Sequence, residues 1–535
     1  MKRHAAVFGI CLLAVAVGAL ALRLPRLALR PMHADEANQA VKTGELFDDG
    51  TYRYDPGDHH GPSLYYLTLP SLWLGQARTF AETDEFQYRI VPAIFGVALV
   101  FLLWPLRKGL GMPVAVCAGV LTALSPAMVF YSRYYVQEML LVFFTAGAIV
   151  SAWRYTQTKS AAWAVAAGVS IGLMHATKET WVLAGAAMVA GLVLTHFWGR
   201  LRDGRGLAFR ECLRWPPLVL GIAAAVIVAC VLFSSFGANW RGPLDSLLCY
   251  TSYAGKAGEN GIHAHPWYFY LAMLICDHPA RRFTWTEGLI VGLAIIGFVA
   301  ALRKNDIPDA HRPLVRFLGF YTLALTVAYA LIPYKTPWCM LSFLHGMILL
   351  AGVGAVALVR WMPCRWSRGA ICLVLAALAV HLGWESYQLN FRYYADQRNP
   401  YNYPPTSTDG VEMARLVERV AAVAPDGREM IIKVITPENY WPLPWYLRKF
   451  NPDHIGWYHE MPATPDDPPA SVMIVAKEVQ EELDARLHGP YFRTGMFGLR
   501  PSVLMVVYVQ DGLWQKFAAS QEPKAAGGKQ AERQP

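Results

Sequence analysis

The sequence predicts an all-α polytopic membrane protein with a small α/β domain near its C-terminal end. Of its 535 residues, 55% are hydrophobic and only 16% are charged, whereas a soluble protein has about a quarter charged residues. The apolar residues form long blocks and do not alternate with polar ones, which is typical of membrane-spanning helices. After about residue 390 these blocks give way to shorter mixed segments, which predict a separate folded unit.

Apolar runs of about 17 to 22 residues predict about eleven membrane spans. The runs lie near residues 5–22, 90–106, 113–131, 137–153, 161–176, 181–198, 216–235, 285–302, 315–332, 338–359 and 369–386. The first run follows Lys2 and Arg3 as a signal peptide would, but its length and the many later spans favour an uncleaved helix. Weaker runs at 64–74 and 267–276 are candidates for interfacial or further spanning segments.

Basic residues mark every second loop between these spans. With the N-terminus on the cytoplasmic side, the loops that fall on that side include residues 107–108, 154–159, 200–214, 303–316 and 360–368. This agreement with the positive-inside rule accounts for the net charge of +9, so no nucleic-acid partner is expected. We expect a multi-pass protein of the cell (inner) membrane, in contact with membrane lipids, whose active face and C-terminal domain are extracytoplasmic.

The chain divides into four parts. We expect a transmembrane domain over residues 1–390, with a large first outer loop at 23–89, and then a linker at 391–407 rich in Tyr, Asn and Pro. Residues 408–519 predict the α/β domain, and 520–535 predict a disordered tail. Within the α/β domain, helical spacing occurs at 411–422 and 478–487, and β-branched runs occur at 430–435, 472–476 and 503–509.

Two adjacent carboxylates, Asp35 and Glu36, follow the first predicted span. A carboxylate at this boundary can act as a general base on an acceptor hydroxyl. Its neighbour can orient a ligand or hold a divalent cation. The alternative is a solvated helix cap, because Asp is a common N-cap residue.

A second polar group, His59 and His60 before Gly61–Pro62, lies in the same outer loop. Histidines beside acids bind metals or phosphate, and the Gly–Pro pair tightens the turn that presents them. The alternative is a polar loop that leads into an interfacial helix with an aromatic belt.

Three isolated cations, Arg133, Lys178 and Lys335, stand at the outer ends of predicted spans, and Glu179 follows Lys178. A phosphate headgroup needs such donors, although most interfacial cations only reach toward lipid headgroups. Lys335 is the strongest candidate, because the prolines on either side restrict its backbone. No metal site is predicted, since the chain has no C-x-x-C pair and its histidine spacings match no closed zinc pattern.

Taken together, these motifs resemble the type C glycosyltransferases, which include the protein mannosyltransferases and the aminoarabinose lipid A transferases. The resemblance rests on the acidic pair after the first span, the large outer loop, His60–Gly61–Pro62 and the segment Ser125–Arg133. A narrower resemblance is to the flippase-activity-associated family. It rests on residues 32–37 (MHADEA), 52–56 (Tyr-x-Tyr-Asp-Pro) and 331–338 (LIPYKTPW).

The resemblance implies a membrane enzyme that transfers a sugar from a polyprenyl-phosphate carrier to an acceptor outside the cytoplasm. It implies that Asp35 is the base. His60 stands where the aminoarabinose transferases place a phosphate-contacting lysine, and His59 stands where they place an acid. The acceptor class, whether glycan, lipid or protein, stays open.

Two functions follow as hypotheses. In the first, Asp35 deprotonates the acceptor of an inverting transferase, while Arg133, Lys178, Lys335 and His60 neutralise the departing phosphate. In the second, the chain is a non-catalytic component that assists the translocation or handling of lipid-linked sugars, and it does not depend on the Asp35 carboxylate. A secondary transporter is disfavoured, because the sequence has no paired halves.

Overall fold

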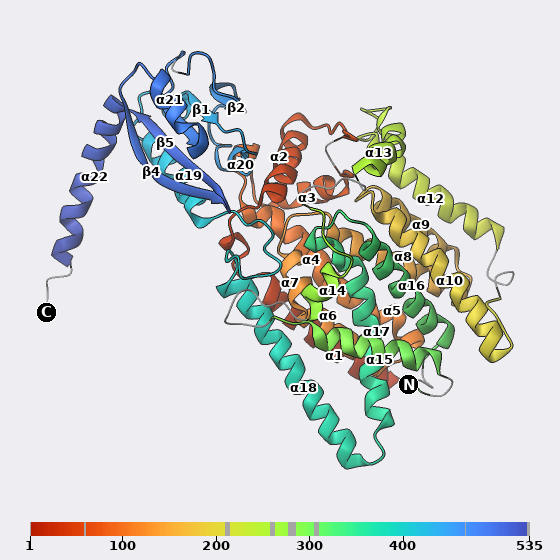
Figure 1. The fold of residues 1–535 in the computed structure, drawn as a ribbon. Coiled ribbons are helices and arrows are strands. Elements are labelled where there is room, and N and C mark those ends of the chain that lie inside the picture. The colour runs from red at the N-terminus through yellow and green to blue at the C-terminus, as the bar shows by residue number, and fades with distance from the viewer. Residues whose placement is uncertain are drawn as a thin grey trace.

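The computed structural model describes residues 2–57, 60–208, 214–256, 263–275, 285–303, 306, 310–465 and 467–531. It consists of a helical bundle and a smaller α/β domain that packs on one end of the bundle (Figure 1). The chain is thus mostly helical, as the sequence predicts.

Within the described residues, eight helical segments are long and apolar enough to cross a membrane. They contain α1 (Lys2–Arg23), α4 (Glu85–Phe101) with α5 (Leu103–Leu110), α8 (Glu138–Thr158), α10 (Trp181–Asp203), α12 (Trp215–Phe233), α16 (Arg312–Leu331), α17 (Leu341–Trp361) and α18 (Arg365–Tyr387). Two further apolar helices, α9 (Ala161–His175) and α15 (Gly288–Leu302), have 15 residues each. The chain is a multi-pass membrane protein, and the count of eleven spans stays a prediction.

The span predicted at 113–131 is two helices, α6 (Met112–Leu124) and α7 (Pro126–Ser132), which meet at an angle of 59°. The cause is Pro126, which lacks an N–H and disfavours a helical conformation at the preceding residue. Ser125 accordingly leaves the helix (φ −53°, ψ 120°), and its side chain accepts a hydrogen bond from the Met128 N–H.

Four shorter helices lie in the connections of the bundle: α2 (Ala34–Asp49), α3 (Ser63–Leu74), α13 (Gly242–Lys256) and α14 (Phe269–Ile275). The weaker apolar runs of the sequence correspond to α3, whose 12 residues are too short to span a bilayer, and to α14, which the structure describes up to Ile275. Helices α2 and α3 lie at the end of the bundle that carries the α/β domain (Figure 1).

The α/β domain contains a five-stranded sheet in the order β2-β1-β3-β5-β4. Strands β1 (Ile432–Ile435), β2 (Ile455–Tyr458) and β3 (Val472–Ala476) are parallel, and β5 (Val503–Gln510) and β4 (Tyr491–Arg500) continue the sheet antiparallel. The domain also contains α19 (Thr408–Ala421), α20 (Leu443–Tyr446), α21 (Gln480–Arg486) and α22 (Asp511–Ala531), of which α22 includes part of the predicted tail.

The sequence predicts β1, β3 and β5 but not β2 or β4. The first three are β-branched and mostly buried, whereas β4 contains two glycines and is largely exposed. Strand β2 has only four residues, none of them fully buried. Short or exposed edge strands carry little hydrophobic pattern, so a single sequence does not reveal them.

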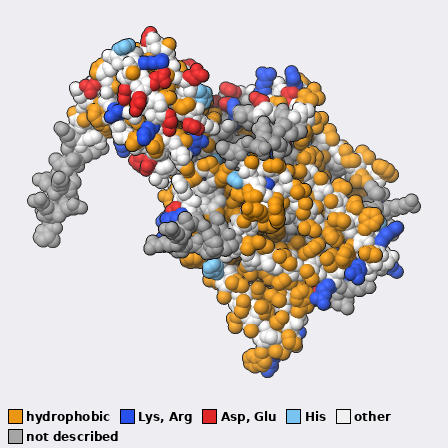
Figure 2. All heavy atoms as spheres, viewed as in Figure 1, with side chains coloured by type: hydrophobic (Ala, Val, Ile, Leu, Met, Phe, Trp, Pro, Cys, Tyr) orange, Lys and Arg blue, Asp and Glu red, His pale blue; other side chains and the backbone are white. Residues whose placement is uncertain are grey.

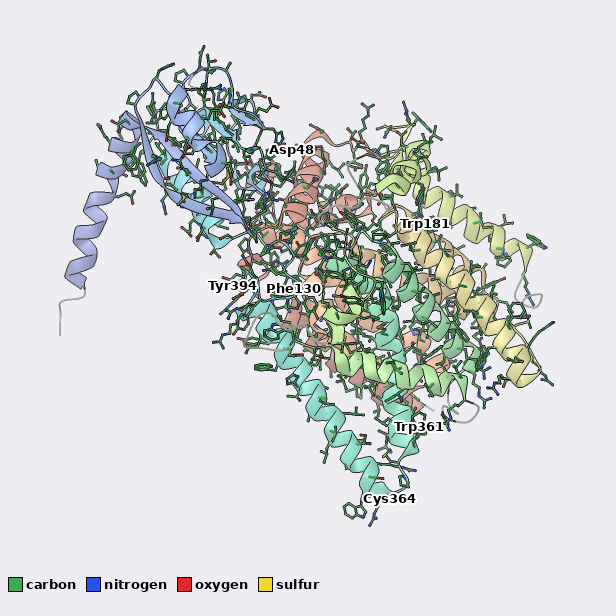
Figure 3. The ribbon with its side chains drawn as sticks, in the orientation of Figure 1. Asp48, Phe130, Trp181, Trp361, Cys364 and Tyr394 are labelled. Atoms are coloured by element: carbon green, nitrogen blue, oxygen red, sulfur yellow. The ribbon has the colours of Figure 1, made fainter. Side chains whose placement is uncertain are left out.

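The two ends of the bundle differ in chemistry. Apolar side chains cover the visible flank of the bundle, while charged side chains cover the α/β domain (Figure 2). Trp361 and Cys364, at the turn between α17 and α18, lie at the end away from that domain, and Asp48 lies near it (Figure 3). Basic residues flank the distant turn, as the positive-inside pattern requires: Arg360, Arg365 and Arg368.

Candidate active site

Glu36 lies at the centre of a buried ionic network. Its two carboxylate oxygens accept hydrogen bonds of 2.7 Å from Nε and Nη2 of Arg89. They also accept the N–H groups of Tyr135 at 2.8 Å and His33 at 3.1 Å, and Arg30 lies 3.6 Å away. Burial alone would raise the pKa of Glu36, but the guanidinium of Arg89 lowers it to about 2. The contacts assign Glu36 to fastening α2, α4 and the α7–α8 connection, and they leave it no free oxygen for a ligand.

Asp35 has the opposite surroundings. It is half-buried on the first turn of α2, where its N–H donates to Nδ1 of His33 at 3.0 Å. No described residue donates a hydrogen bond to its carboxylate. Its charge adds to burial in raising the pKa of Tyr334 and Tyr403, and it opposes the burial that lowers the pKa of His263. These three side chains therefore lie within electrostatic reach of Asp35.

Aromatic rings line the same region. Trp338 stacks on Tyr134, with ring centroids 5.9 Å apart and planes at 30°, and its ring also meets those of His33 at 5.9 Å and Tyr403 at 6.3 Å. The Tyr403 hydroxyl lies 3.0 Å from Nδ1 of His263. Rigid aromatic surfaces with a few polar atoms are suited to the binding of a sugar ring.

His60 and Glu179 form a pair between two distant parts of the sequence. Nδ1 of His60 lies 2.8 Å from one Glu179 oxygen, and the Tyr54 hydroxyl donates to the other at 3.3 Å. Burial would raise the pKa of Glu179, but the charge and hydrogen bond of His60 lower it. His59 lies outside the described residues.

The turn that carries His60 packs directly on the chain before Lys178. A Cβ on Gly61 would lie 2.4 Å from the carbonyl carbon of Ala176, so only glycine fits this approach. The Ser63 N–H donates to the same carbonyl at 2.8 Å, and the Ser63 and Thr177 hydroxyls are 2.7 Å apart. The predicted motifs at 60–62 and 177–179 are therefore neighbours.

Lys178 forms a buried ion pair with Glu138 at the start of α8. Burial lowers the pKa of Lys178, but the Glu138 carboxylate reverses this and raises it above its ordinary value. The positive charge of Lys178 also acts to lower the pKa of Tyr334, which the negative charge of Asp35 acts to raise. Tyr334 therefore lies within electrostatic reach of both Lys178 and Asp35.

Lys335 is held by the chain around His263 and His265. Its N–H donates to the His263 carbonyl at 2.9 Å, and its ammonium donates to the carbonyls of His265, at 3.2 Å, and Ile332. Its side chain is almost fully buried, with 1% exposed. Among the described residues no carboxylate lies within 4.0 Å of it, so its positive charge is not neutralised by an ion pair.

Arg133 holds the end of α1. Its guanidinium donates to backbone carbonyls in the last turn of α1 and just after it: Leu22 at 3.4 Å, Arg23 and Pro25 at 2.8 Å, and Arg26 at 3.0 Å. It also lies 4.6 Å from the centre of the Phe391 ring. These contacts fix the start of the large loop that follows α1, and a role for Arg133 in headgroup binding stays a prediction.

Sequence reasoning missed the residues that complete these networks. Arg89 follows two acids at the start of an apolar span, and an arginine at that depth usually has a partner. This signal could have marked Arg89 as a residue with a buried acidic partner. Tyr403 lies in the segment 391–407 that was expected to be a simple linker, and no local pattern links it to His263.

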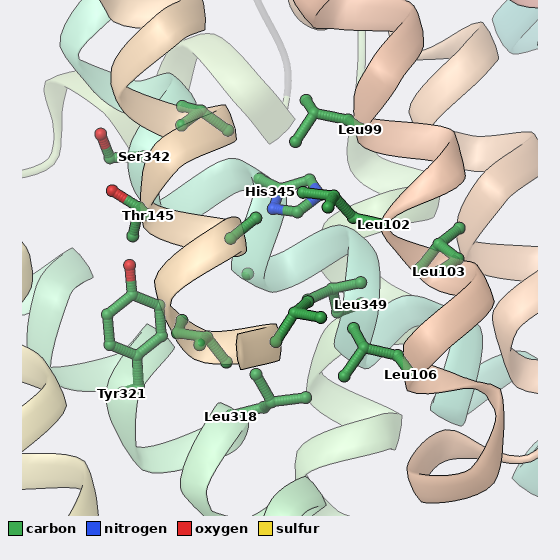
Figure 4. Close-up of a pocket in the computed structure, with 15 residues that line it drawn as sticks. Leu99, Leu102, Leu103, Leu106, Thr145, Leu318, Tyr321, Ser342, His345 and Leu349 are labelled. Carbon is green, nitrogen blue, oxygen red and sulfur yellow. The ribbon is translucent and has the colours of Figure 1, made fainter. Parts of the chain in front are cut away.

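A separate small cavity of about 20 Å³ lies between the helices of the bundle, large enough for one water molecule (Figure 4). Its polar lining includes Thr145, Tyr321, Ser342 and His345, and the hydroxyls of Thr145 and Tyr321 have no hydrogen-bond partner. None of the predicted site residues lines it. Among the described residues, no group of three His, Cys, Asp or Glu side chains could hold a metal ion.

Comparisons with known proteins agree with this architecture. Residues 65–237 match the family model of the dolichyl-phosphate-mannose-protein mannosyltransferases. No curated protein matches the chain. A crystal structure of ArnT from Cupriavidus metallidurans bound to undecaprenyl phosphate is 15% identical. It has a TM-score of 0.62 and covers 95% of this chain and 98% of its own.

A second similar structure is the oligosaccharyltransferase AglB from Archaeoglobus fulgidus, in complex with an inhibitory peptide and a dolichol-phosphate. It is 13% identical, has a TM-score of 0.55, and covers 92% of this chain and 74% of its own. The fold that the resemblance implies is therefore confirmed, while the narrower flippase-associated family stays a prediction. The chain has the type C glycosyltransferase fold.

Proposed function

We propose that this protein is a membrane glycosyltransferase that transfers a sugar from a polyprenyl-phosphate carrier to an extracytoplasmic acceptor, with Asp35 as general base. The observation that carries the proposal is the half-buried carboxylate of Asp35, which accepts no hydrogen bond from any described residue. A base must have a lone pair available for the proton that it takes. The similarity of the whole fold to polyprenyl-phosphate-binding ArnT supports the donor class.

In the proposed reaction, the acceptor hydroxyl docks at Asp35 and attacks the anomeric carbon of the donor sugar. A bond forms between that carbon and the acceptor oxygen, the bond to the phosphate oxygen breaks, and the proton passes to Asp35. Attack from the face opposite the phosphate inverts the anomeric centre, through a state with oxocarbenium character. Polyprenyl phosphate leaves with the bonding electron pair.

Lys335 is the best candidate to stabilise the charge on the departing phosphate. Its ammonium contacts only backbone carbonyls, so its positive charge is available to an anion. A preorganised cation in a poorly hydrated site lowers the energy of such a transition state. Lys178 and His60 are assigned lesser roles, because Glu138 and Glu179 already pair with them.

The aromatic group of Tyr134, Trp338 and Tyr403 is proposed to hold the transferred sugar. Its rings lie between the Asp35 end of α2 and the loop that carries Lys335. This arrangement supports a donor with its sugar on the aromatic surface and its phosphate toward Lys335. The side of the bundle with the α/β domain is proposed to face away from the cytoplasm.

Asp35→Asn tests the proposal in full-length protein reconstituted in liposomes with radiolabelled polyprenyl-phosphate sugars. The measured quantities are release of polyprenyl phosphate and labelling of the acceptor fraction. Loss of a general base lowers turnover by about 10²- to 10⁴-fold. Asp49→Asn is the matched control, since Asp49 is an exposed residue of the same helix.

Near-normal turnover of Asp35→Asn would remove this residue from the mechanism. A protein that binds the carrier but supports no Asp35-dependent turnover would favour the alternative, a non-catalytic component that handles lipid-linked sugars. In that case Lys335→Ala would weaken carrier binding, while Asp35→Asn would leave the translocation phenotype intact.

A further inference from the structure

The α/β domain is fastened directly beside Asp35. The Met32 N–H donates to the Tyr446 hydroxyl at 2.8 Å, and the Thr406 hydroxyl donates to the Met32 carbonyl at 2.7 Å. The next residue, Ser407, donates its N–H to the carbonyl of Leu499 at 3.0 Å. A continuous set of hydrogen bonds therefore connects the strand end at Leu499 with the chain that enters α2.

Two further contacts hold the domain in this position. The Trp445 indole donates to the Glu85 carboxylate at 3.1 Å, and the Arg448 guanidinium donates to the Thr83 carbonyl at 2.5 Å. Arg448 also stacks on Trp445, 3.7 Å from the ring centre. The β4–β5 hairpin accordingly points toward the helical bundle (Figure 1).

Arg500 ends β4 at the tip of this hairpin. Its Nη2 donates to the Asn439 carbonyl at 2.5 Å, while its Nε is buried and has no hydrogen-bond partner. A buried N–H without a partner is unfavourable, so this atom needs an oxygen from outside the described contacts. The neighbouring acid on the Asn439 segment is Glu438.

Arg500 lies within electrostatic reach of Asp35. Burial lowers the pKa of Arg500, and the negative charges of Glu438 and Asp35 act in the opposite direction. The Asp35 carboxylate nevertheless forms no ion pair with Arg500 within 4.0 Å. The hydrogen bonds from Ser407 to Leu499 and from Thr406 to Met32 place the end of β4, where Arg500 follows Leu499, near the start of α2.

We propose that Arg500 is an acceptor-binding residue that recognises an anionic group, a carboxylate or a phosphate, next to the hydroxyl that Asp35 deprotonates. A guanidinium offers parallel N–H donors that match the oxygens of such a group. The Asp35 carboxylate repels the anion, so Arg500 both attracts the acceptor and orients its hydroxyl toward Asp35. This inference rests on the proposed function for the meaning of the acceptor, but its test does not require turnover.

The test measures equilibrium binding of two matched probes, methyl glucuronide and methyl glucoside, to full-length protein in lipid nanodiscs. The probes differ only in the carboxylate at C6. Wild-type protein is expected to bind the glucuronide about 10- to 100-fold more tightly, as for a hydrogen bond to a charged group. Octyl versions of both probes distinguish a lipid-borne acceptor from a soluble one by a further gain in affinity.

Arg500→Gln is expected to abolish the preference for the glucuronide without changing the affinity for the glucoside. Arg493→Gln is the matched control, because Arg493 lies on the same strand and contacts Asp484 on the domain surface. Arg500→Lys retains the charge but lacks the Nε donor, and it is expected to lose several-fold in preference. It serves as the second variant if Arg500→Gln does not fold.

The inference would be overturned if wild-type protein bound the glucuronide and the glucoside equally, or bound neither. It would also be overturned if the preference for the glucuronide were unchanged in Arg500→Gln and Arg500→Lys. Asp35→Asn separates this result from the proposed function. It removes the negative charge of Asp35, which repels the probe's carboxylate, so the glucuronide is expected to bind at least as tightly while transfer is lost. If protein that retains Arg500 prefers the glucuronide but transfers no sugar, the result contradicts the proposed function and leaves the role of Arg500 in binding intact.

Discussion

Asp35 and Glu36 are neighbours on one helical turn, yet the regions around their carboxylates differ in every physical respect. Glu36 faces inward, where two arginines and two backbone N–H groups surround its oxygens. Asp35 faces the region of Tyr334 and Tyr403, and none of the described residues donates a hydrogen bond to it. The comparison shows that Glu36 is fully hydrogen-bonded within the protein and holds its segments together. The Asp35 carboxylate accepts no hydrogen bond from the described residues, which agrees with its proposed role as the base.

The same division runs through the other charged residues at the end of the bundle that carries the α/β domain. Lys178 is paired with Glu138, and His60 with Glu179, so both pairs join segments that are far apart in sequence. Lys335 and Arg500 contact only backbone carbonyls in the described part of the chain. Paired charges therefore join the loops, whereas Lys335 and Arg500 form no ion pair with the described residues.

The largest expected effect on stability is that of Glu36→Gln. It leaves Arg89 buried and only partly paired, and breaking a buried ion pair on one side costs about 3–5 kcal/mol. Thermal unfolding of the purified protein, followed by fluorescence-detected size exclusion, measures this cost. Asp35→Asn is the control and is expected to change stability by less than about 0.5 kcal/mol. Equal destabilisation by both variants would abolish the distinction between the two carboxylates.

The second-largest expected loss of stability comes from breaking the ion pair between Lys178 and Glu138. Lys178→Met leaves the Glu138 carboxylate buried without its cation and is expected to cost about 3 kcal/mol. The double variant with Glu138→Gln removes both charges, and it should recover most of this loss, since a buried pair contributes little net stability over neutral side chains. A double variant as unstable as the sum of the two single ones would show that the charges do not act as a pair.

Much of this architecture follows from the sequence, because long apolar blocks and alternating basic loops specify a membrane protein and its two ends. The position of Asp35 at a span end also marks it as a candidate base. The split role of the acidic pair does not follow, since helical periodicity alone does not say which carboxylate meets Arg89. Nor does the approach of Arg500, which depends on how a separate domain docks some 460 residues later in the chain.

Gly61→Ala is expected to have a smaller effect, of about 1–3 kcal/mol, typical of overpacking. The added Cβ would lie 2.4 Å from the backbone of Ala176, so the turn that carries His60 must shift away from Glu179. The variant should lower the unfolding temperature and also weaken the His60–Glu179 pair. Gly57→Ala is the control, because its nearest neighbour is the Asp55 side chain at 3.3 Å in an exposed turn. Equal stability of both variants would contradict the close packing of residues 60–62 on 176–179.

The smallest expected effect is a pH dependence that comes from Glu179. Its pKa in the folded protein lies below its ordinary value of 4.5, because His60 outweighs the effect of burial. The resulting stability is fully present above pH 4.5 and is lost as the pH falls through the folded pKa, where the carboxylate takes up a proton. The stability difference between wild type and Glu179→Gln should therefore shrink as the pH falls below 4.5. Unfolding curves of both proteins at a series of pH values measure it. If the stability difference between the two proteins stayed constant or grew on acidification, Glu179 would not be stabilised as a carboxylate. The His60–Glu179 contact would then not be an ion pair.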